Sequence, residues 1–162
     1  MWEQVFEVLT ADRDNQYLMI DSTIVRPPAG RHWKRRPKDQ AIGRSRGGLT
    51  TKIHLLADAL GRPLRIIATA GQAGDVTQAS VHLEGNAFWA VIAGMGARAV
   101  IPSNRSHKTI IPYDALACRH RNRIERCFNR MKHFRRFATR YDPITIHFSG
   151  FAYLGAAMIW MW

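Results

Sequence analysis

A single acid inside an apolar run constrains the fold of this chain more than any other feature. Residues 17–25 are rich in aliphatic and β-branched side chains, which is typical of a β-strand. Asp21 stands in the middle of this run. Burying an unpaired carboxylate is costly, so an acid in such a place is usually paired with a cation or bound to a metal ion. We therefore expect a strand whose acid is either paired with a cation or bound to a metal ion.

A second group of charges lies much later in the chain. Arg121, Glu125 and Lys132 fall within an arc of roughly 40° if the segment is an α-helix. A carboxylate flanked by cations suits metal-assisted phosphoryl chemistry on a polyanion. An ordinary surface helix with mixed charges explains the spacing equally well. Beside the arc runs an apolar stripe, which consists of Ile124, Cys127, Phe128, Met131 and Phe134.

The charge balance favours a polyanionic partner. The 162 residues include 24 Lys and Arg against 12 Asp and Glu, a formal net charge of +12. Such an excess is the electrostatic footprint of nucleic-acid binding. An anionic membrane surface or simple solubility are the alternatives. The cysteines, Cys118 and Cys127, form no disulfide framework, and the N-terminus lacks a secretory pattern, so we expect a cytoplasmic protein.

Periodicity and turn residues divide the chain into alternating strands and helices. The final apolar stretch, 148–162, would be about 22 Å long as a helix, short of a bilayer core near 30 Å. We interpret it as a buried helix that packs on the sheet, with a membrane anchor as the alternative. The predicted elements are a helix at 2–9, strands at 17–25, 49–57 and 63–70, a hairpin turn at 58–62, helices at 76–83 and 86–94, a strand at 97–101, a helix over 113–136 in one or two pieces, and a last helix after a break at 140–143, with basic loops at 26–48 and 102–112.

Four segments resemble the DDE transposases encoded by bacterial insertion sequences. Residues 19–23 resemble the family's first catalytic strand. Arg121, Glu125 and Lys132 match the Arg, Glu and Lys of its third catalytic motif, although Cys118 stands where that motif has Tyr. Residues 43–54 and 71–73 also resemble the family. The resemblance implies one partial α/β catalytic domain over residues 1–162, with an RNase H-like mixed sheet flanked by helices and Asp21 on a central strand.

The resemblance also implies a site and its partners. Asp21 and Glu125 would bind Mg²⁺ (or Mn²⁺), while Arg121 and Lys132 would contact DNA phosphate or orient Glu125. These four are the expected catalytic residues. The carboxylates of Asp21 and Glu125 should converge. The implied partner is double-stranded DNA, both insertion-sequence ends and target, with a possible homo-oligomer and no membrane.

Basic side chains predict where DNA would lie. The loop 43–48 can cradle a phosphate because glycine allows close backbone approach. An ordinary flexible loop is the alternative, and Lys52 faces either DNA or solvent. The predicted DNA-binding residues are Arg31, Lys34, Arg35, Arg36, Arg44, Arg46 and Lys52.

The family's second catalytic Asp has no counterpart. No Asp occurs between Asp75 and Asp114, and Glu84 lies at a predicted helix end. We interpret this gap as an internal deletion of about 15–20 residues, the size of a strand and its connection. The expected function is cleavage and transfer of DNA strands during transposition, by a truncated and inactive copy. A catalytically dead nucleic-acid-binding remnant is the alternative. A ribosomal or chromatin-type binder would explain the charge but not Asp21.

Overall fold

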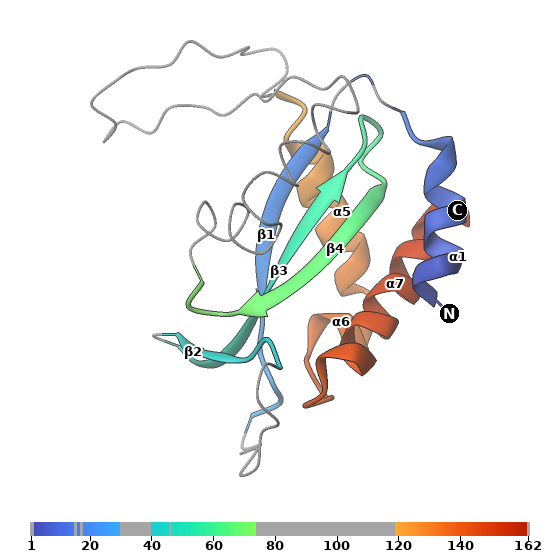
Figure 1. Ribbon diagram of the computed structural model, residues 1–162. Helices are drawn as coiled ribbons and strands as arrows, with labels where there is room; N and C mark the ends of the chain where they lie inside the picture. Colours follow the sequence, from blue (N-terminus) through green and yellow to red (C-terminus); the bar gives the residue numbers. More distant parts are fainter. Residues whose placement is uncertain are drawn as a thin grey trace.

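The sheet is built around its longest strand. The computed structural model describes residues 2–14, 16, 18–29, 40–45, 47–73 and 119–161. Within them, β3 (Gly48–Ala57) pairs antiparallel with β1 (Met19–Val25) and with β4 (Pro63–Ala70). The first residues of β3 also pair with the short β2 (Gly43–Ser45) (Figure 1). The three strands predicted at 17–25, 49–57 and 63–70 are confirmed.

The structure corrects one prediction about this sheet and leaves another untested. The prediction that 26–48 is wholly loop is wrong, because β2 and the start of β3 form a short hairpin inside it. Among the described residues β1 has one strand neighbour, β3, and so lies at an edge. The predicted helices at 76–83 and 86–94, the strand at 97–101 and the loop at 102–112 lie outside the described residues. The central position of β1 therefore stays a prediction.

One face of the sheet carries the core. Residues directly opposite each other on paired antiparallel strands share a face. Asp21 is opposite Leu55, and Leu55 is opposite Ile66, so all three lie on the same face. Leu55 and Ile66 are buried in the main hydrophobic cluster, together with apolar side chains of the helices. Asp21 therefore lies at the border of the core, on the side where the helices pack.

The helices that cover this face are amphipathic or apolar. α5 (Asn122–Lys132) contacts β1, and α7 (Thr145–Met161) contacts β4 and the N-terminal α1 (Trp2–Leu9) (Figure 1). A one-turn 3₁₀ helix, Thr10–Asp12, follows α1. The helix predicted at 2–9 and the buried C-terminal helix are confirmed. No helix among the described residues is long and apolar enough to cross a bilayer.

The helix predicted over 113–136 is interrupted. Phe134 has an extended backbone (φ −78°, ψ 104°), which separates α5 from α6 (Arg135–Ala138). Residues 113–118 lie outside the described part. The predicted stripe is confirmed, because Ile124, Cys127 and Met131 are fully buried. Burial raises the pKa of the Cys127 thiol to about 12, with Arg130 opposing and Asp58 adding to the shift, so Cys127 stays a neutral core side chain.

The break between α6 and α7 is organised by a buried arginine. The Arg140 guanidinium donates hydrogen bonds to the carbonyls of Gln40 (2.7 Å) and Ala41 (3.0 Å) and to the Thr51 hydroxyl. Its backbone N–H donates to the Arg26 carbonyl at 2.9 Å. Burial lowers the pKa of Arg140 to about 10, with Asp142 opposing, so the side chain is charged at neutral pH. This junction joins the ends of β1 and β3 to the start of α7.

Candidate active site

The acid of β1 meets the arginine that begins α5. Arg121 Nη2 lies 3.4 Å from Asp21 Oδ1, although the two residues are 100 positions apart. The same oxygen accepts a hydrogen bond from the Ser22 backbone N–H at 2.9 Å. The Asp21 side chain is 21% exposed and that of Arg121 is 58% exposed, so the pair is open to solvent. Of the two alternatives for Asp21, a pair with a cation or a bound metal ion, the structure shows the pair.

Glu125 lies next to this pair along the helix. Its backbone N–H donates to the Arg121 carbonyl at 3.4 Å, which places it one turn further on the same edge of α5. Both side chains are exposed. Lys132 continues this edge at the end of α5, about 10 Å beyond Glu125 at 1.5 Å per residue. The structure thus brings Asp21 and Arg121 into contact, places Glu125 one turn further along α5 and leaves Lys132 apart. The convergence of the Asp21 and Glu125 carboxylates stays a prediction.

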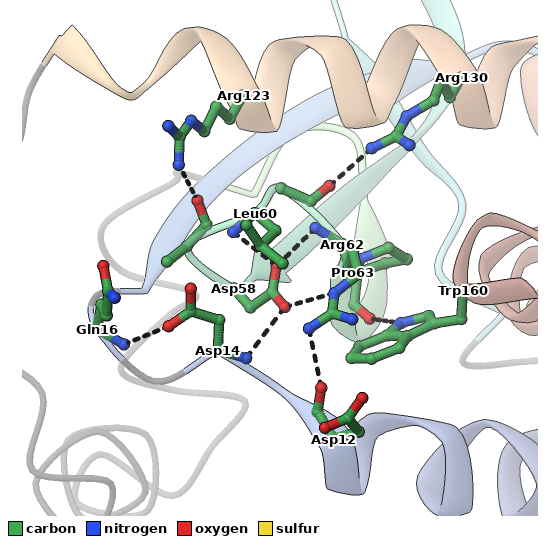
Figure 2. Close-up of polar contacts among 12 residues, drawn as sticks. Asp12, Asp14, Gln16, Asp58, Leu60, Arg62, Pro63, Arg123, Arg130 and Trp160 are labelled. Carbon is green, nitrogen blue, oxygen red and sulfur yellow. Dashed lines mark hydrogen bonds and ion pairs between the residues drawn. The ribbon is translucent and has the colours of Figure 1, made fainter. Parts of the chain in front are cut away.

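The opposite edge of α5 is bound to the β3–β4 turn. Arg123 donates to the Ala59 carbonyl, and Arg130 donates to the Gly61 carbonyl at 3.2 Å (Figure 2). Gly61 has a positive φ of 79°, and a Cβ there would lie 3.0 Å from the Arg123 carbonyl oxygen. The turn and the helix therefore approach too closely for a larger residue. These contacts fix how α5 is rotated, and so direct the Arg121 and Glu125 edge towards β1.

The turn is itself held by a buried carboxylate. Asp58 is fully buried and accepts hydrogen bonds from Arg62 Nε (2.8 Å) and from the backbone N–H groups of Leu60, Arg62 and Asp14 (Figure 2). Arg62 also donates to the Asp12 carbonyl at 2.8 Å and lies 4.0 Å from the centre of the Trp160 ring. The predicted hairpin turn at 58–62 is confirmed, and it connects α1, α5 and α7.

Residues 43–54 and 71–73, the two glycine-containing segments that resemble the family, pack against each other. A Cβ at Gly43 would lie 1.4 Å from Gln72 Oε1, and one at Gly71 would lie 1.8 Å from Thr50 Oγ1. Only glycine allows these approaches without displacing a neighbour. Lys52 Nζ donates to the Ala73 carbonyl at 2.8 Å. Lys52 is opposite Ile24, on the sheet face away from Asp21. It therefore packs this corner, and its contact with DNA stays a prediction.

The remaining predicted DNA-binding residues divide into two groups. Arg44 is exposed on β2. Arg31, Lys34, Arg35, Arg36 and Arg46 lie outside the described residues. The predicted set does not include the exposed arginines of α6, Arg135 and Arg136, although their adjacent positive charges are visible in the sequence.

Whether a divalent cation could bind depends on the carboxylates that the described residues offer. Mg²⁺ binds proteins through one or two carboxylates and keeps several waters or phosphate oxygens. Among the described residues no group of three or more His, Cys, Asp or Glu side chains could hold a metal ion. Binding of Mg²⁺ by Asp21 and Glu125 therefore stays a prediction.

Comparison with known proteins gives one clear relative. No protein-family profile and no solved structure matches the chain. A Brucella ovis protein named "Putative transposase for insertion sequence element IS6501" is 34% identical over 131 residues, which cover 70% of this chain and 99% of the relative. The chain belongs to the insertion-sequence transposases. The prediction of an insertion-sequence transposase is thereby confirmed, whereas its assignment to the DDE type stays a prediction. As in the prediction, this transposase chain has a sheet flanked by helices.

Proposed function

We propose that the chain is the catalytic domain of a DDE-type transposase with an RNase H-like fold, and that it binds double-stranded DNA. The observation that carries this proposal is the contact between Asp21 and Arg121. The two residues come from motifs 100 positions apart, and each resembles a different catalytic motif of that family. A chance resemblance gives no reason for both motifs to meet at one sheet edge.

Each residue of the site has a chemical part in this proposal. Asp21 and Glu125 would hold Mg²⁺, which supplies charge neutralisation at a phosphodiester. Arg121 restrains one oxygen of Asp21 and presents positive charge to a DNA phosphate. Lys132, exposed on the same edge of α5, would contact a phosphate further along the strand.

We also propose that this copy binds DNA without cleaving it. Metal-dependent strand cleavage in the resembling family uses three carboxylates, and two are present here. The alignment with the relative supports an internal deletion. Seventy per cent of 162 residues is about 113, so about 18 of the 131 aligned positions have no residue of this chain. That number agrees with the size of one strand and its connection.

Nicking of supercoiled plasmid tests the loss of catalysis. We expect no relaxation of the plasmid above background in Mg²⁺ or Mn²⁺, and the same result for Asp21→Ala, because two carboxylates are too few for a two-ion site. Nicking that disappears in Asp21→Ala would contradict this proposal. It would also direct attention to Glu84 or Asp75 as a third ligand.

The salt dependence of DNA binding tests the partner. Each phosphate contact contributes about 0.9 to the slope of log K against log salt. Replacing Arg31, Lys34, Arg35 and Arg36 with Ala is expected to flatten that slope by several units, if the basic loop lies on DNA. Equal unfolding temperatures of the two proteins would show that the fold is intact. A slope that does not change would show that this loop faces away from DNA.

A further inference from the structure

An open basic cleft is formed by α6 and the segment between α6 and α7. Its volume is about 640 Å³, and it is lined by Arg135, Arg136, Tyr141 and Asp142. Two cations and one acid leave it with a formal charge of +1. None of these residues belongs to the candidate active site or to the predicted DNA-binding set.

The two guanidinium groups of the cleft are held in place by their neighbours. Arg135 Nε donates to the Tyr141 hydroxyl at 3.0 Å. Arg136 Nη1 donates to Asp142 Oδ2 at 3.3 Å, and its guanidinium lies 4.4 Å from the centre of the Phe151 ring. A guanidinium carries five N–H donors, and each of these hydrogen bonds uses one. The Arg136 side chain is 55% exposed, so a ligand can reach it.

One helix connects the candidate active site to the cleft. α5 follows Arg121, runs behind the sheet and ends at Lys132, and α6 follows after Phe134 (Figure 1). The eleven residues of α5 span about 16 Å. That length corresponds to about five base pairs of duplex at 3.4 Å each. Arg126 and Lys132 are exposed along the way, and Glu125 is the acid of this helix.

We propose that this cleft binds a phosphate of the DNA backbone, several nucleotides from the strand position at Asp21 and Arg121. The inference rests on the proposed function, because it needs DNA at the active site. Arginine suits the role because its planar fork matches two phosphate oxygens at once. Asp142 pairs with Arg136 and lowers the net charge of the cleft. Because phosphate contacts carry no sequence information, the site would position a backbone without reading its sequence.

A matched pair of charge removals tests the cleft. Binding of the full chain to a duplex of about 30 base pairs with arbitrary sequence is measured at several salt concentrations. Arg136→Ala is expected to lower the slope of log K against log salt by about 0.9, as for one phosphate contact. Arg65→Ala removes an equal charge from an exposed position on β4, and is expected to leave the slope unchanged.

A third variant raises the positive charge of the cleft instead of lowering it. Asp142→Asn removes the acid and is expected to tighten binding several-fold at low salt. This variant also serves if Arg136→Ala does not fold, because unchanged binding by Asp142→Asn would then overturn the proposal.

The outcomes separate this inference from the proposed function. If the wild-type chain binds the duplex and Arg136→Ala behaves like Arg65→Ala, the cleft proposal fails while DNA binding stands. If the wild-type chain does not bind the duplex at all, the proposed function fails and the cleft proposal fails with it.

Discussion

Asp58→Ala is expected to lower the free energy of unfolding by about 3–5 kcal/mol, the usual cost of breaking a buried ion pair. The carboxylate is fully buried and accepts hydrogen bonds from Arg62 Nε and three backbone N–H groups. Removing it leaves these donors without their acceptor inside the protein. Urea unfolding followed by circular dichroism measures the change.

Two controls make the Asp58 result specific. Asp142→Asn alters an ion pair whose side chains are 55% and 25% exposed, and is expected to cost less than about 1 kcal/mol. Asp58→Asn keeps an oxygen acceptor but loses the charge. Its loss of unfolding free energy should therefore lie between the losses in Asp58→Ala and Asp142→Asn. A loss of under about 1 kcal/mol in Asp58→Ala would show that the turn does not depend on this carboxylate.

Arg140→Met is expected to cost about 3 kcal/mol of unfolding free energy. Methionine retains much of the apolar stem, but the oxygens of Gln40, Ala41 and Thr51 lose a charged donor inside the protein. The loss should also loosen the link between the end of β1 and the start of α7. Thermal and urea unfolding measure the effect.

The control for Arg140 lies on the neighbouring helix. Arg135 is exposed, and Arg135→Met is expected to change the unfolding free energy by no more than about 0.5 kcal/mol. Arg140→Lys keeps the charge but not the planar fork, and should fall between Arg140→Met and the wild type. Equal stabilities of the two methionine variants would contradict a structural role for Arg140.

Local patterns predicted most of the described elements. β3 and β4 were predictable because their apolar, β-branched runs are bounded by a turn sequence. The helix over 113–136 was predicted in one or two pieces, but the position of the break was not predictable, because the apolar period of α5 continues through Phe134 while the backbone there becomes extended. β2 is only three residues long and begins with Gly43, so it carries no periodic signal.

The site was predictable only where its chemistry is unusual. An acid within a strand suggested that Asp21 is paired or binds a metal, but its contact with Arg121 was not predicted, because the two residues lie 100 positions apart. Arg140 gave no such signal, because three of its acceptors belong to residues 40, 41 and 51. The surroundings of Asp58 depend in the same way on distant residues, because Asp14 donates to it and its partner Arg62 contacts Asp12 and Trp160.

The two edges of α5 have a consequence for how such a protein changes once cleavage is no longer selected. Arg123 and Arg130 on one edge hold the β3–β4 turn, whereas Arg121 and Glu125 lie on the other. A rigid helix cannot rotate one edge without the other. Mutations that keep the chain folded will therefore also preserve the direction in which Glu125 points. If this copy no longer cleaves DNA, as we propose, the orientation of the edge that carries Arg121 and Glu125 should still persist, because the fold depends on the other edge of the same helix.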